Sequence, residues 1–167
     1  MTGVRARSGR AAATPPDQDG RRREAERRVL LGVVAATLVG VGGWALLAPA
    51  SFYADFPFGR SWVALDGPFN EHLVRDVGAL QLALGVVAGL AVTRPWLTGV
   101  AALATLVFAV PHLAYHATHL APFGVGDAVA QLVALTVQVL VPLRLLRIEP
   151  GLAPAPVRPG RPPGGAS

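Results

Sequence analysis

Four long apolar stretches constrain this chain more than any other feature. They cover residues 29–47, 77–93, 97–116 and 128–146, and each approaches the roughly 20 apolar residues that a helix needs to cross a bilayer. None has the polar face that a surface helix of a soluble protein would show. The sequence therefore predicts an all-α fold, a four-helix transmembrane bundle whose main partner is the lipid bilayer.

The segments outside these stretches have a different composition. Residues 1–28 include the basic run "RRREAERR", and residues 148–167 are rich in proline and glycine. Neither has hydrophobic periodicity, so we expect two disordered tails around a membrane domain at residues 29–147. The chain has no cysteine, which excludes disulfides and thiolate chemistry. Its arginines match no nucleic-acid-binding motif, so no nucleic-acid partner is expected.

The arginines also predict the orientation. If the helices alternate in direction, the basic run, Arg94, Arg144 and Arg147 fall on one side of the membrane, and Arg60 and Arg75 fall on the other. Positively charged loops favour the cytoplasmic side. We therefore expect a multi-pass protein of the cell (inner) membrane with both termini in the cytoplasm.

Small and polar residues at helical spacing indicate which faces pack inside the bundle, because small side chains allow membrane helices to approach closely. Two glutamines on the fourth helix, Gln131 and Gln138, should also point inward, since polar groups are costly against lipid. The expected seams are Gly32, Ala36 and Gly40 on the first helix, Gly78, Gly85 and Gly89 on the second, and Ala101, Thr105 and Ala109 on the third.

Three of the four histidines lie in the stretch "PHLAYHATHL" at the end of the third helix. His112, His116 and His119 continue the small-residue seam of that helix, so they should face its neighbours. At 1.5 Å per residue, His112 lies about 22 Å along the helix from Leu97, within the hydrocarbon region. An imidazole at that depth needs a polar partner.

Other polar residues are expected at the same level of the membrane. Glu71 with Arg75, and His72 with Asp76, have the i, i+4 spacing of helical pairs. Asn70 and Asp127 have the residue types that cap the second and fourth helices. The resulting cluster at the outer face consists of His72, His112, His116, His119, Glu71, Arg75, Asp76 and Asp127.

Three interpretations of this cluster remain open. It is a structural hydrogen-bonded network, with Asp76 as the favoured partner of His112 and His116. Alternatively it binds a metal or haem, with His112 and His116 as candidate ligands. The third interpretation is a proton or quinone site. The aromatic loop at residues 48–72 either lies on the outer interface or covers the cluster as a lid.

The motifs "LLAPASFYADFPFGRSWVALDGPFNEHLVRDVGALQLALG" and "VPHLAYHATHL", followed by a span that opens with Asp, resemble a group of small actinobacterial four-helix integral membrane proteins. More distantly, Arg75, Gly78 and Gly85 at the start of the second helix resemble the DoxX-like superfamily. Some DoxX relatives are linked to quinone-coupled sulfur oxidation or redox stress. The resemblance implies the architecture and carries no catalytic residue onto this chain.

The sequence thus predicts an integral membrane protein whose cluster is mainly structural. The alternatives are a DoxX-like membrane redox component that binds haem, metal or quinone, and a small transporter. The transporter is disfavoured because the helices show no internal repeat with matched broken segments, although a homo-oligomer would change that. No cofactor and no catalytic residue is assigned.

Overall fold

The computed structural model describes residues 18–148, and this part of the chain is built from helices without a strand. Four helices are long: α1 (Gln18–Leu47), α4 (Glu71–Thr93), α5 (Thr98–Thr118) and α6 (Val125–Ile148). Three are short: α2 (Pro49–Asp55), α3 (Trp62–Asp66) and the 3-10 turn η1 (Pro95–Leu97). Each long helix is long and apolar enough to cross a membrane. The predicted all-α four-helix fold is confirmed.

The first helix differs from the prediction at its start. We expected residues 18–28 to belong to a disordered tail, but α1 already begins at Gln18. The physical reason is that this part of α1 has partners elsewhere in the bundle. Glu26 accepts two hydrogen bonds from Arg144 of α6, at 2.7 and 3.0 Å. The predicted tails at residues 1–17 and 149–167 lie outside the described residues.

The closest packing joins α1 to α4. A Cβ atom added at Gly42 would lie 2.7 Å from the Gly78 carbonyl oxygen, and one added at Gly85 would lie 2.9 Å from the Val39 backbone nitrogen. The α4 seam through Gly78 and Gly85 is therefore confirmed. The expected α1 seam is wrong, because the positions of Gly32 and Gly40 are open. The contact face of α1 passes through Gly42 instead, on another side of the helix.

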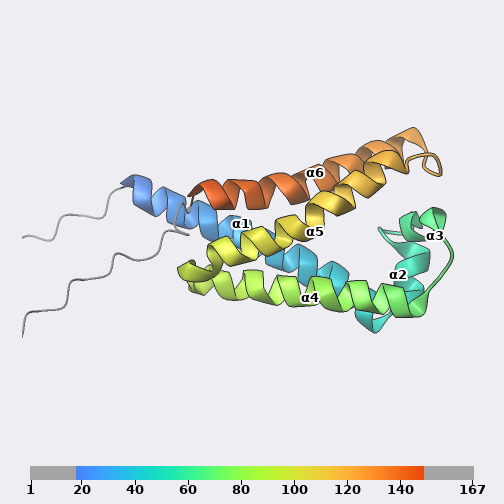
Figure 1. The fold of residues 1–167 in the computed structure, drawn as a ribbon, viewed down its shortest axis with the longest axis horizontal. Helices are drawn as coiled ribbons and strands as arrows, with labels where there is room; N and C mark the ends of the chain where they lie inside the picture. The colour runs from blue at the N-terminus through green and yellow to red at the C-terminus, as the bar shows by residue number, and fades with distance from the viewer. Residues whose placement is uncertain (1–17, 149–167) are drawn as a thin grey trace, which may run out of the picture.

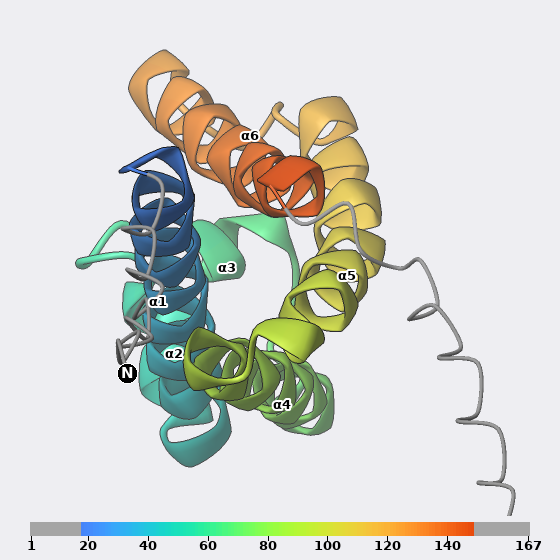
Figure 2. The ribbon, with the colours of Figure 1, turned by 90° about the vertical axis from the view of Figure 1, so that its left-hand side faces the viewer.

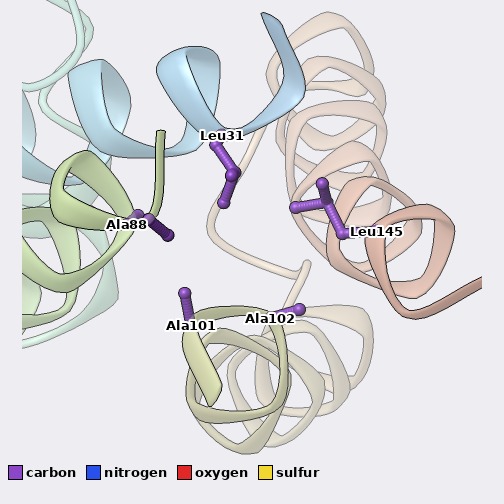
Figure 3. Close-up of a cluster of buried hydrophobic side chains, with 6 residues drawn as sticks. Leu31, Ala88, Ala101, Ala102 and Leu145 are labelled. Carbon is purple, nitrogen blue, oxygen red and sulfur yellow. The ribbon is translucent and has the colours of Figure 1, made fainter. Parts of the chain in front are cut away.

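The long helices form two antiparallel pairs, α1 with α4 and α5 with α6. Figure 2 shows them around the bundle in the order α1, α4, α5, α6. The pairs lie together at the end where α1 begins and diverge toward the end that carries α2 and α3 (Figure 1). A buried apolar cluster from all four helices joins them at the first end (Figure 3). Its members are Leu31, Ala88, Ala91, Ala101, Ala102 and Leu145.

Arg27 is buried beside this cluster, with only 1% of its surface exposed. Its guanidinium donates to the carbonyl oxygens of Ala91 and Val92 at 2.7 and 3.2 Å, and to Thr98 Oγ1 at 3.2 Å. It also pairs with Glu24 at 2.8 Å. The last carbonyls of a helix have no partner within the helix. Arg27 therefore closes the end of α4 and ties it to the start of α5.

Candidate functional site

A cavity of about 340 Å³ lies where the two helix pairs diverge. All four long helices and the segment that contains α2 and α3 contribute to its wall. Its polar lining includes Asp66, Gln81, His112, His116, Gln131 and Gln138. The divergence of the pairs thus creates a polar chamber inside an otherwise apolar bundle.

One wall of the cavity is aromatic. Phe52 and Phe56 come from α2 and the residue that follows it, and Trp62 begins α3. The Phe52 and Phe56 ring centroids are 4.8 Å apart, and those of Phe56 and Trp62 are 6.3 Å apart. These three aromatic side chains of the loop cover the cavity, whereas Phe58 and Phe69 are exposed, so the loop has features of both expected arrangements.

The histidines of α5 reach the cavity because the helix turns one face toward its neighbours. Ala101, Thr105 and Ala109 are buried along that face, as predicted. His112 and His116 continue it and line the cavity. The His112 ring stacks on Phe108 with a centroid distance of 5.2 Å, and meets the His116 ring edge-on at 4.7 Å.

Three polar atoms in the lining have no hydrogen-bond partner among the described residues. They are His116 Nδ1, Gln131 Oε1 and Gln138 Oε1. Gln131 is 4% exposed, so its amide is removed from bulk water. A buried acceptor without a donor costs about 1–3 kcal/mol. The two glutamine oxygens are acceptors for hydrogen-bond donors brought by something inside the cavity, and His116 Nδ1 donates or accepts according to the tautomer of its ring.

The other predicted cluster residues on α4 lie on its exposed first turns. Glu71 pairs with Arg75 at 2.8 Å, and His72 pairs with Asp76 at 3.2 Å, as their spacing predicted. Arg75 also donates to the carbonyl oxygen of Leu46 at the end of α1. These contacts stabilise the start of α4 and the end of α1, and their residues do not line the cavity.

The last two predicted members lie apart from the histidine pair. Asp127 does not cap α6, because the helix begins at Val125; its carboxylate accepts hydrogen bonds from Arg60 and from Trp62 Nε1. It therefore holds the α2–α3 segment against α6. His119 is exposed, stacks on Tyr115 at 4.0 Å and contacts the Tyr115 carbonyl oxygen at 2.8 Å.

The eight predicted residues are thus not brought together as one network. We expected His112 or His116 to lie within hydrogen-bonding reach of Asp76, Glu71, Arg75 or Asp127, directly or through one water, and no direct hydrogen bond of this kind is formed among the described residues. The reason is the divergence of the helix pairs, which separates the end of α5 from the start of α4. Within residues 18–148, no group of three or more His, Cys, Asp or Glu side chains is arranged to hold a metal ion.

Sequence reasoning missed several residues of the site. Gln81 has the same signal that identified Gln131 and Gln138, a glutamine within an apolar span, and it is buried in the lining. Asn70 caps α4 as expected, with its side chain accepting from the Leu73 amide at 3.1 Å. Asp66, Arg60 and Trp62 belong to the α2–α3 segment, where no periodicity indicates which side chains face inward.

Comparison with other proteins does not add a family. No protein-family model, curated protein or solved structure matches this chain.

Proposed function

We propose that this chain is a membrane-embedded binding protein for a small organic molecule that carries hydrogen-bond donors. The observation that carries the proposal is the buried Gln131 side chain, whose Oε1 has no partner within the described residues. Two further unpaired atoms, on Gln138 and His116, line the same cavity. A ligand with hydroxyl or N–H groups pairs these atoms and recovers the free energy lost by their burial.

The cavity also defines the size and shape of the ligand. At about 340 Å³, it lies near the lower end of the range for small-molecule pockets, about 300–1,000 Å³. Phe52, Phe56 and Trp62 offer flat apolar contacts on one side. Gln131 and Gln138 lie on α6, and Gln81 lies on α4. This arrangement suits a compact molecule with one apolar face and at least two donor groups.

This proposal changes the role of the cluster predicted from the sequence. The pairs Glu71–Arg75 and His72–Asp76 keep a structural role. His112 and His116 belong to the binding site. The rings of His112 and His116 supply two ligands for a metal ion. A structural zinc site has four protein ligands and a catalytic zinc site has about three, so the two rings alone do not complete either kind of site. Purification in mild detergent, followed by a visible absorption spectrum and elemental analysis, separates an organic ligand from haem or metal.

The binding test uses a matched pair of probes, 1,3-cyclohexanediol and its dimethyl ether. The ether keeps the ring and the oxygen atoms but has no donors. Trp62 lines the cavity, so its fluorescence reports occupancy once Trp44 and Trp96 are replaced by phenylalanine. The diol should change this fluorescence with saturation, and the ether should not.

The variant Gln131→Leu tests whether the response comes from the cavity. It removes the buried acceptor and keeps a side chain of similar size. We expect the diol response to weaken by about tenfold or more, the loss that corresponds to one hydrogen bond of about 1.4 kcal/mol. An equal response to both probes, or an unchanged response in Gln131→Leu, would show that the cavity is not a donor-binding site.

A further inference from the structure

A second hollow lies next to the cavity, between α4 and α5. It has a volume of about 790 Å³ and is apolar except for His112. Leu80 and Leu84 form its α4 wall, while Leu103, Val107 and Phe108 belong to its α5 wall. Leu80 is 51% exposed and Val107 is 69% exposed, so this groove opens on the outside of the bundle. In a membrane, that side faces the hydrocarbon chains of lipids.

His112 connects the groove to the cavity, because its side chain lines both. The rings on either side extend this connection. Phe108 lines the groove and stacks on His112, and His116 lines the cavity and meets His112 edge-on. Phe108, His112 and His116 thus follow one another at i, i+4 along one face of α5, from a residue of the groove to a residue of the cavity that holds the unpaired polar atoms.

We propose that the ligand is a neutral single-chain lipid, whose compact head occupies the cavity and whose hydrocarbon chain lies in the α4–α5 groove. This inference rests on the proposed function and adds the substrate class. The groove and the cavity share His112 in their walls, so one molecule whose chain passes this side chain can place an apolar tail in the groove and a donor-bearing head in the cavity. Such a molecule reaches the site laterally from the membrane, past His112.

Charge selects the kind of head group. The acidic side chain in the cavity lining is Asp66, and the unpaired atoms of Gln131 and Gln138 are amide oxygens. A carboxylate and two carbonyl dipoles present negative charge to the ligand, and like charges in a low-dielectric site repel strongly. An anionic phosphate or carboxylate head is therefore disfavoured. A head that carries hydroxyl groups fits the same atoms.

The test compares four probes on the Trp62 reporter protein at a fixed detergent concentration. The first is 1-monooleoylglycerol, which has the chain and two hydroxyl donors. Methyl oleate has the chain without donors, oleate has an anionic head, and 1,3-cyclohexanediol has donors without a chain. We expect 1-monooleoylglycerol to change the Trp62 fluorescence with saturation at the lowest concentration. Methyl oleate and oleate should bind with an affinity at least about tenfold lower.

Two matched variants separate the groove from the cavity. Ala104 lines the groove, and Ala130 is exposed on α6 and lines neither hollow. Ala104→Phe should lower the affinity for 1-monooleoylglycerol about tenfold or more, because displacing even a few buried methylene groups from the groove costs that much affinity. It should leave the diol response unchanged, and Ala130→Phe should change neither response.

The outcomes distinguish this inference from the proposed function. If the diol binds and Ala104→Phe leaves the affinity for 1-monooleoylglycerol unchanged, the chain does not lie in the groove and the inference is overturned. A methyl oleate or oleate affinity equal to that of 1-monooleoylglycerol overturns the assignment of a neutral donor head. If the diol fails to bind the unmodified cavity, the proposed function itself is wrong.

Discussion

At the scale of single residues, Arg27 shows how much one side chain depends on its neighbours. It belongs to the basic run that the sequence assigns to a disordered tail. In the structure its guanidinium is buried and bonds the last carbonyls of α4. Arg28, the next residue, has a side chain that is 61% exposed and pairs with Glu24 alone among the described residues. The identity of the inward-facing arginine depends on where α4 ends, which the run itself does not specify.

Replacing Arg27 with alanine should therefore destabilise the bundle. The change leaves the carbonyls of Ala91 and Val92 and the Thr98 hydroxyl without their donor, and each buried acceptor without a donor costs about 1–3 kcal/mol. Arg28→Ala is the matched control, and an exposed pair contributes only about 0–1 kcal/mol. Thermal unfolding in mild detergent measures both. Similar melting temperatures for the two variants would contradict the role of Arg27.

At the scale of elements, glycine positions decide how closely α1 and α4 approach. Gly42 and Gly40 are on the same helix, but only Gly42 contacts α4. Gly42→Ala would put a Cβ atom 2.6 Å from the Leu82 backbone nitrogen, so the helices must separate. We expect a loss of about 1–3 kcal/mol in the free energy of unfolding, as for other overpacked contacts.

Gly40→Ala is the control, because its Cβ atom would meet nothing within 4 Å. It should leave the melting temperature unchanged or raise it slightly, since alanine has the higher helix propensity. If Gly40→Ala were as harmful as Gly42→Ala, the contact face of α1 would be the one predicted from the sequence.

The helices and the contacts within each helix were the features that the sequence predicted best. Apolar length identified all four long helices, and i, i+4 spacing identified the pairs Glu71–Arg75 and His72–Asp76, because these signals are local. The inward faces of α4, α5 and α6 followed from small and polar residues. The face of α1 did not, since Gly32 and Gly42 carry the same local signal and only the position of α4 distinguishes them.

The site depended on information that the sequence lacks. His112 and His116 were correctly placed on the inner face of α5, but their partners were not. Helical spacing fixes a direction around one axis and says nothing about the angle between two helices. The divergence of the two pairs removes Asp76 from reach and brings in Asp66 from α3. A residue of so short a helix has no periodic signal that would place it.

At the scale of the whole molecule, the arrangement of charge defines an orientation. The two helix pairs lie together at one end of the bundle, which we call the closed end, and diverge at the other, the open end. The closed end contains the start of α1, the turn between α4 and α5 and the end of α6, and the open end contains Arg60 and Arg75. We propose that the closed end faces the cytoplasm, in keeping with the preference of basic segments for that side. The cavity then lies toward the outer face of the inner membrane.

Cysteine labelling tests this orientation, and the absence of native cysteine makes the background clean. Single cysteines at Ser51 and Ala121, both exposed near the open end, should react with an impermeant thiol reagent in intact cells. A cysteine at Ser167 should react only after the cells are lysed. Labelling of the Ser167→Cys variant in sealed cells would reverse the proposed topology.

The central claim is that His116, Gln131 and Gln138, which line the cavity, bind a ligand and do not form a structural hydrogen-bonded network. The most direct measurement is the melting temperature of ligand-free Gln131→Leu in mild detergent. If Gln131 Oε1 is unpaired, an apolar side chain of similar size removes a cost of about 1–3 kcal/mol, and the melting temperature should rise. Thr98→Val, which removes a buried hydroxyl bonded to Arg27, should lower it. A fall in Gln131→Leu that matches the fall in Thr98→Val would contradict the claim, because it would show that Gln131 is already part of a satisfied network.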